Sequence, residues 1–365
     1  MTGTEEATAG SSPTDAVSRR IAALLTGLAP QGRNEIHAIF VLAATAELAA
    51  VVATDEQGVA AQIIPTGEVM ALVRAHREAS TALSEGPWWR YLLVVSMSGE
   101  VRTDYDFGDE PFPDEHLFDP DVYRADLEVF PRYRLPVWLG AHIRHGDRQS
   151  RPAEVAARAE PDAAVVETDL PALPSMVGRW AVLSAAFVAV GSPWGPRVLP
   201  ALGMFEGVER SGSSLWVLPG DRAVLSGRVW NDPVLDAVYN TGAKMPDLYA
   251  GAPAWVANPV LDPRAGIGLL SFCYWWDRGR WYRGDSPAVA DIAAAVPGVW
   301  SQESTAEIVA ALIDDRTGDR EAVRALVRAA DRGKIDRAAL TRVFADGDID
   351  DAWLQLIMAG VAADE

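Results

Sequence analysis

Residues 88–110 read WWRYLLVVSMSGEVRTDYDFGDE. The aromatic and aliphatic run at the start of this stretch is rich in residues that favour β-strands. A turn at Ser98 and Gly99 separates it from a second, alternating run, which is the sequence pattern of a β-hairpin. The stretch therefore predicts two antiparallel strands that belong to a larger sheet.

The segment after this hairpin is strongly acidic. Between residues 104 and 121 the chain has eight carboxylates and no Lys or Arg. The carboxylates are Asp104, Asp106, Asp109, Glu110, Asp114, Glu115, Asp119 and Asp121. Tyr105, Phe107, Phe112 and Phe118 lie among them. These rings either supply apolar contacts to a partner, as aromatic residues do in many interfaces, or point into the core by strand alternation.

The sequence around the hairpin predicts an α+β domain over residues 14–147, preceded by a disordered N-terminus at residues 1–13. Strands are expected at 35–45, 47–54 and 59–64, and helices at 17–28, 67–83 and 119–130, from period-2 and helical spacing of the apolar residues. This order of elements favours an antiparallel sheet with helices covering one face.

The remaining chain predicts a second α+β domain and a tail. Residues 148–173 are rich in Ala, Glu, Arg and Pro and are interpreted as a linker or a short bridging helix. Residues 174–313 contain two further hairpin patterns, at 214–230 and 267–283. Residues 314–365 show three short helical stripes, which either cap the second domain or form a docking appendage. The fold class is thus α+β, with two domains of antiparallel, hairpin-rich sheets covered by helices, plus a C-terminal helical tail.

Composition narrows the range of partners. The 365 residues are 49% hydrophobic and carry a net charge of -19, which is typical of a folded, acidic protein. A negative field repels phosphate, so nucleic acid is not an expected partner. The charge favours a basic protein or a metal ion as partner, or it serves solubility alone.

The cellular location is expected to be the cytoplasm. Cys273 is the single cysteine, which excludes an intramolecular disulfide framework and fits a reducing compartment. The first 15 residues lack both the basic start and the apolar stretch of a signal peptide. The most apolar window, residues 36–53, is interrupted by Glu47, so we interpret it as two buried strands and expect no membrane insertion.

No cofactor is expected, although one metal hypothesis stays open. The acidic segment lacks the ligand spacing of a calcium loop. His116, His142 and His145 have carboxylates nearby and could form a metal or general-base cluster, but their spacing is not specific. Gly140 and Gly146 favour a strand and turn there, with histidines at the surface. The acidic stretch 346–351 is interpreted as a helix cap with acidic residues in the first turn.

The hairpin also resembles a known family. Residues 15–145, and most visibly Trp89-Arg90-Tyr91-Leu92-Leu93-Val94, Gly99-Glu100-Val101 and Asp104-Tyr105-Asp106-Phe107, resemble the YezG-like immunity proteins of bacterial polymorphic toxin systems. The helix with Tyr123 looks similar too. This resemblance covers about a third of the chain. It implies a small cytoplasmic α+β domain that binds and neutralises a cognate toxin and has no catalytic centre.

These observations predict an immunity protein or antitoxin that binds a basic toxin domain through an acidic, aromatic surface. The expected contact residues are Asp104, Tyr105, Asp106, Asp109, Glu110, Asp114 and Glu115. Two alternatives remain. The first is a metal-assisted hydrolase that uses His116, His142 or His145, and the second is a non-catalytic scaffold that joins other proteins.

Overall fold

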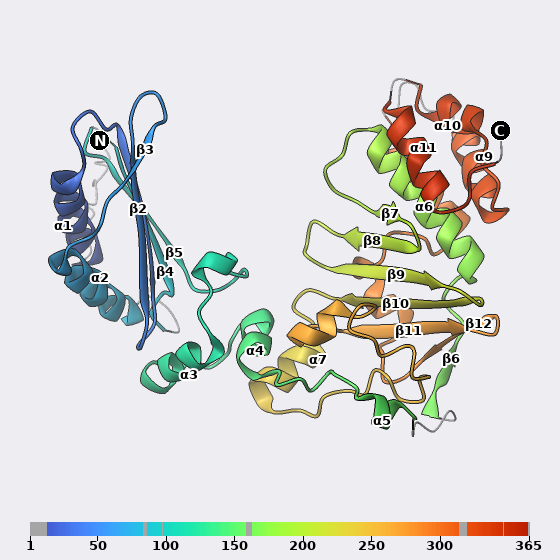
Figure 1. Ribbon diagram of the computed structural model, residues 1–365, viewed down its shortest axis with the longest axis horizontal. Coiled ribbons are helices and arrows are strands. Elements are labelled where there is room, and N and C mark those ends of the chain that lie inside the picture. The colour runs from blue at the N-terminus through green and yellow to red at the C-terminus, as the bar shows by residue number, and fades with distance from the viewer. Residues whose placement is uncertain are drawn as a thin grey trace, which may run out of the picture. The chain divides into compact units, whose positions relative to one another are not determined.

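The structure is a computed structural model that describes residues 13–82, 86–96, 98–157, 163–313, 320–345 and 347–363. The chain divides after Arg144 into two units, each with its own antiparallel sheet and its own helices (Figure 1). The α+β fold class predicted from the sequence is confirmed. The predicted disordered N-terminus lies outside the described residues, except for Pro13, which begins the first helix.

The first unit contains a five-stranded sheet, and the predicted hairpin forms two strands at one edge of it. The strand order is β3-β2-β1-β4-β5. The strands are β1 (Glu35–Leu42), β2 (Glu47–Thr54), β3 (Ala60–Gln62), β4 (Arg90–Ser96) and β5 (Val101–Asp106). In the β4–β5 hairpin, Tyr91 lies opposite Tyr105 and Arg90 lies opposite Asp106. β5 is therefore an edge strand that leads directly into the acidic segment.

Two helices cover one face of this sheet, α1 (Pro13–Leu28) and α2 (Gly67–Ala79) (Figure 1). Ile21 and Leu25 of α1 and Val69 and Val73 of α2 pack with the inward residues of β1 and β4. The side chain of Thr66 accepts a hydrogen bond from the Val69 amide and so caps the start of α2. Burial of these apolar side chains gives the first unit its hydrophobic core.

Two further helices follow the hairpin in the first unit, α3 (Pro120–Val129) and α4 (Val137–Arg144). The strand expected at Gly140 is wrong, because this residue lies inside α4, whereas the turn expected at Gly146 is present, with the Arg148 amide donating a hydrogen bond to the His145 carbonyl. A glycine within a helix costs only about 1 kcal/mol. Six of the eight residues of α4 are buried, and that packing outweighs the local preference.

The second unit has a seven-stranded antiparallel sheet of order β6-β12-β11-β10-β9-β8-β7. Its strands are β6 (Val165–Glu167), β7 (Arg197–Leu199), β8 (Leu202–Glu206), β9 (Gly212–Leu218), β10 (Arg222–Arg228), β11 (Phe272–Asp277) and β12 (Arg280–Arg283). The β9–β10 and β11–β12 hairpins were predicted. β11 begins later than expected, because Pro263–Ile267 form a 3-10 helix. The predicted linker is partly built into this unit, since β6 pairs with β12.

The helices of the tail belong to the core of the second unit. α9 (Arg320–Asp331), α10 (Arg337–Val343) and α11 (Ile349–Met358) pack with α6 (Leu173–Ala189), a helix that the sequence analysis did not identify, and with α8 (Gln302–Leu312). Gly178 of α6 lies so close to the Ala330 carbonyl of α9 that a Cβ atom would clash. The described tail therefore completes the second unit and is not a separate appendage. As predicted, the acidic stretch near its end caps a helix, with Asp348 accepting a hydrogen bond from the Asp351 amide.

Candidate functional site

The acidic segment of the first unit presents most of its carboxylates to solvent. Five of the seven predicted contact residues are exposed: Asp104, Asp109, Glu110, Asp114 and Glu115. Asp104 lies on the edge strand β5, and Asp114 and Glu115 lie in the short 3-10 helix η2 (Asp114–His116). These five exposed carboxylates lie between residues 104 and 115, and we call this set of side chains the acidic surface.

Internal contacts fix the backbone that carries the acidic surface. The ring of Phe112 is buried and meets Trp138 of α4 edge to face, with centroids 5.1 Å apart. The Trp138 Nε1 group donates a hydrogen bond of 2.7 Å to the Gly108 carbonyl. Gly108 has a φ of 89°, and a side chain there would meet the Trp89 ring at 3.2 Å. The segment is thus a packed loop, which lowers the entropy lost when a partner binds.

The remaining two predicted contact residues are partly used inside the unit. Asp106 forms a 2.7 Å ion pair with Arg90 and also accepts a hydrogen bond from the Gly108 amide. The half-buried Tyr105 ring stacks on Tyr91, with centroids 5.5 Å apart. The rings of Tyr105 and Phe112 therefore point into the core and are not presented to a partner. Carboxylates, and not aromatic rings, form the outer surface of the segment.

The three histidines of the metal hypothesis lie in different settings. His116 is buried, and burial, together with the nearby Arg90, lowers its pKa. A ring nitrogen of His142 lies 2.9 Å from the Phe118 carbonyl, so this histidine links α4 to the acidic segment. His145 belongs to the second unit. Across the residues with described positions, no group of three or more His, Cys, Asp or Glu side chains could hold a metal ion.

A buried histidine lies in the core of the first unit. The Trp88 Nε1 group donates a hydrogen bond of 3.1 Å to Nδ1 of His76, so the proton of the neutral ring is on Nε2. Nε2 lies 3.3 Å from the Ser18 hydroxyl and 3.4 Å from the Tyr105 hydroxyl. Burial lowers the pKa of His76 to about 4. The ring is therefore neutral at pH 7 and serves as an internal hydrogen-bond link.

The next residue along α2, Arg77, forms a buried ion pair. Its Nη2 group lies 2.9 and 2.8 Å from the two carboxylate oxygens of Asp126 in α3. The same carboxylate accepts hydrogen bonds from Trp89 Nε1 at 2.9 Å and from the Ala44 amide at 2.8 Å. Such a charge is stable in the interior because every partner is satisfied. Asp126 thus joins three distant segments of the first unit.

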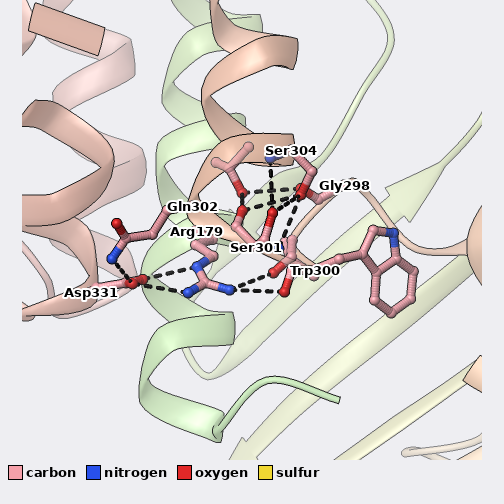
Figure 2. Close-up of polar contacts among 9 residues, drawn as sticks. Arg179, Gly298, Trp300, Ser301, Gln302, Ser304 and Asp331 are labelled. Atoms are coloured by element: carbon pink, nitrogen blue, oxygen red, sulfur yellow. Dashed lines mark hydrogen bonds and ion pairs between the residues drawn. The ribbon is translucent and has the colours of Figure 1, made fainter. Parts of the chain in front are cut away.

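The second unit contains a comparable polar network, shown in Figure 2. Arg179 of α6 donates two hydrogen bonds of 2.9 Å to Asp331 at the end of α9. It also donates to the backbone carbonyls of Val299 and Trp300. Gln302, at the start of α8, donates a hydrogen bond of 2.6 Å to the same aspartate. The network fixes three helices relative to one another, and its hydrogen-bonding groups are used in doing so.

A second buried carboxylate, Asp262, lies under the sheet of the second unit. The Tyr249 hydroxyl donates a 3.1 Å hydrogen bond to it, and the Cys273 thiol lies 3.9 Å away. Burial raises the pKa of Asp262 to about 7 and raises that of the Cys273 thiol well above its usual range. A thiol with a raised pKa is a poor nucleophile, so these groups do not form a reactive cysteine centre.

Sequence reasoning did not single out His76, Arg77, Arg179 or Asp262. Each lies in a stretch whose local pattern does not distinguish a buried polar residue from an exposed one. The acidic surface, in contrast, was identified from charge density alone. Among the described helices, none has the length and apolar character needed to span a membrane.

Comparison with known proteins does not assign this chain to a family. A scan against protein-family models gives no match, and a search of curated proteins gives none either. The resemblance to YezG-like immunity proteins therefore depends on the residues quoted for it above.

Proposed function

We propose that this protein acts in the cytoplasm by stoichiometric binding, as an immunity protein that neutralises a basic toxin domain. The observation that carries the proposal is the acidic surface, where five exposed carboxylates lie between residues 104 and 115, on the edge strand β5 and the packed segment after it. The resemblance of the first unit to YezG-like immunity proteins points to the same activity.

The acidic surface would act mainly on the rate of association. Clustered charges of one sign steer an oppositely charged protein toward the correct face and raise the rate constant of encounter. Salt screens such attraction, since the Debye length falls from about 10 Å at 0.1 M to about 3 Å at 1 M. The proposal therefore requires association that weakens strongly as the salt concentration rises.

The test begins with affinity capture from the source cells, followed by purification of the captured partner. Its association with the protein is then measured at low and high salt. The binding variant carries Asp109→Lys, Asp114→Lys and Glu115→Lys, which spares Asp106 because that residue pairs with Arg90. The matched control carries Glu56→Lys, Glu78→Lys and Glu128→Lys, three exposed residues of the same unit.

Both variants change the net charge equally, so any difference between them reports on position. We expect the binding variant to lose about tenfold or more in association rate, and the control to stay close to the wild type. Equal binding by the two variants would remove the acidic surface as the site. A captured partner that is acidic, or that has no toxic activity when expressed alone, would contradict the proposed function.

A further inference from the structure

Strand β5 is the longest of the four edge strands that the structure describes. It has six residues, whereas β3, β6 and β7 have three each. β7 is also capped, because the Val198 amide donates a hydrogen bond of 2.7 Å to the side-chain carbonyl of Gln355. Proteins commonly keep edge strands short or covered, since an open edge can pair with another chain. Among these four edges, β5 alone is long enough for a further strand to pair over several residues.

The hydrogen bonds of the β4–β5 hairpin show which backbone groups of β5 face away from the sheet. The Ser96 amide donates to the Glu100 carbonyl at 3.0 Å, so these two residues form a hydrogen-bonded pair in the register of the hairpin. Hydrogen-bonded and non-hydrogen-bonded pairs alternate along an antiparallel ladder. Every second residue of β5 therefore turns its amide and carbonyl to β4, and the residues between them turn theirs outward. The outward residues are Val101, Thr103 and Tyr105.

The outward groups of β5 are mostly unpaired. The Tyr105 amide is used, because it donates a hydrogen bond of 2.9 Å to the Asp104 carboxylate. Across the residues with described positions, the amides and carbonyls of Val101 and Thr103 and the Tyr105 carbonyl have no hydrogen-bond partner on the outer side. Thr103 is also exposed. The edge therefore offers both donors and acceptors to an added strand.

The side chains of β5 indicate which strand would fit beside it. On the side covered by α1 and α2, Val101 and Tyr105 pack with the hydrophobic core, so apolar residues suit that side of an added strand. On the other side, Arg102 pairs with Glu35 at 3.4 Å. Asp104 is exposed and forms no ion pair within the described chain. A basic residue opposite Asp104 would supply the missing cation, since opposite charges across a strand pair attract.

We propose that β5 binds an extended basic segment of the toxin partner, which pairs with it as a sixth strand of the sheet. For the identity of the partner, this inference rests on the proposed function. In strand addition, backbone hydrogen bonds give affinity and the side chains at alternate positions give specificity. Antiparallel pairing sets apolar residues of the segment opposite Val101 and Tyr105 and a basic residue opposite Asp104. The acidic surface then raises the rate of association, and the paired strand slows dissociation.

The test uses the full chain and a synthetic peptide, Lys-Val-Lys-Val-Thr-Val, which matches β5 in length and places a lysine opposite Asp104. Two control peptides have glutamate in place of lysine, or methylated amide nitrogens on the valines, which would face β5. Hydrogen exchange measures binding residue by residue. At about ten times its dissociation constant, the lysine peptide should slow exchange of the Val101 and Thr103 amides about tenfold. Neither control peptide should do so, and the Arg102 and Asp104 amides, already bonded to β4, should change little.

Thr103→Pro tests the same contact from the side of the protein. Proline removes the outward amide, and an edge strand tolerates proline where that amide faces solvent. Loss of this hydrogen bond should weaken binding of the lysine peptide about fivefold to tenfold. Thr103→Val keeps the amide, serves as the matched control and should bind as the wild type does. Exchange of the β4 amides shows whether each variant retains the sheet, and the methylated peptide gives the answer without any variant.

The outcomes separate strand addition from the proposed function. Equal binding by the methylated peptide or the glutamate peptide, or unchanged exchange at Val101 and Thr103, would overturn strand addition and leave the immunity function intact. A captured partner without toxic activity would overturn the function, while binding of the lysine peptide at β5 would still stand. A dimer of the chain alone that Thr103→Pro dissociates would show that a second copy occupies the edge, and would also overturn the proposal.

Discussion

The two units both use an Arg–Asp ion pair to hold distant segments together, but they differ in the titratable group that each buries without a charged partner. Each contains an Arg–Asp pair that joins a helix to distant segments: Arg77 with Asp126 in the first unit, which is buried, and Arg179 with Asp331 in the second, which is partly exposed. Each also buries a titratable group that has no charged partner within hydrogen-bond distance. In the first unit this group is a base, His76, and in the second it is an acid, Asp262.

This difference gives the two units opposite responses to pH. The pKa of His76 is lowered to about 4, so the folded first unit resists protonation and becomes less stable as the pH falls below about 6.5. The pKa of Asp262 is raised to about 7, so the folded second unit takes up a proton and becomes more stable as the pH falls below about 7. A fold class alone therefore does not set the pH response.

The largest effect is expected from breaking the buried pair of the first unit. Arg77→Met leaves the Asp126 carboxylate buried without its cation, which should lower the free energy of unfolding by about 3–5 kcal/mol. Arg179→Met should cost less, because its pair is 10% and 14% exposed instead of 5% and 0%. Denaturant unfolding, followed by hydrogen exchange in each unit separately, measures the loss of unfolding free energy in both variants. Equal losses would mean that burial does not explain the difference.

The pH response itself is the next test. Between pH 7 and pH 4 the first unit should lose roughly 2–3 kcal/mol, because each pKa unit corresponds to about 1.36 kcal/mol. Hydrogen exchange of β4 and of β11 over this range follows the two units separately. The His76 contribution is isolated by His76→Gln, which should flatten the response of β4, while His37→Gln, at an exposed position, should leave it unchanged. A parallel response of both units would contradict the comparison.

A smaller effect is expected from Asp262→Asn. The amide keeps an oxygen that can accept the hydrogen bond from Tyr249, and it removes the negative charge. At pH 8 the variant should be more stable than the wild type, and this advantage should shrink by roughly 2–3 kcal/mol between pH 8 and pH 5, because the folded carboxyl takes up a proton over this range while the unfolded one stays ionised. Thermal unfolding at the two pH values measures this difference. A loss of stability at pH 8 would show that the ionised form is favoured.

The smallest effect is expected at the acidic surface. Asp109→Lys, Asp114→Lys and Glu115→Lys replace exposed side chains, so the free energy of unfolding should change by only about 0.5 kcal/mol for each substitution. Denaturant unfolding of this variant therefore separates a loss of binding from a loss of folding. A large destabilisation would show that the carboxylates contribute to the fold itself.

The hairpins were predictable from sequence because their signals are local. Alternating β-branched and aromatic residues, interrupted by turns at Gly99 and Gly220, define the β4–β5 and β9–β10 pairs without knowledge of the rest of the chain. Helix α6 was missed for the opposite reason. Twelve of its 17 residues are buried, so it lacks the polar face that makes a helical period visible. β6 and β7, of three residues each, are too short to give a pattern.

The candidate site was predictable only in part. The density of charged residues in the sequence located the acidic surface, since five of the seven predicted contact residues are exposed. Alternation along β5 could not show that the ring of Tyr105 faces the helices, because period 2 separates two faces without saying which one is covered. The setting of His76 depends on residues from α1, β5 and the stretch before β4, so it exists only after the chain has folded.

The position of Asp126 has a consequence for the order in which the first unit matures during synthesis. All five strands of its sheet are translated before α3, and domains near the N-terminus can begin folding while the rest is still being made. Until α3 leaves the ribosome, however, Arg77, Trp89 and the Ala44 amide lack their common acceptor. In a nascent chain that ends before residue 126, the sheet should therefore be less stable, because these three donors have no acceptor. Synthesis of Asp126 would then supply the acceptor for all three.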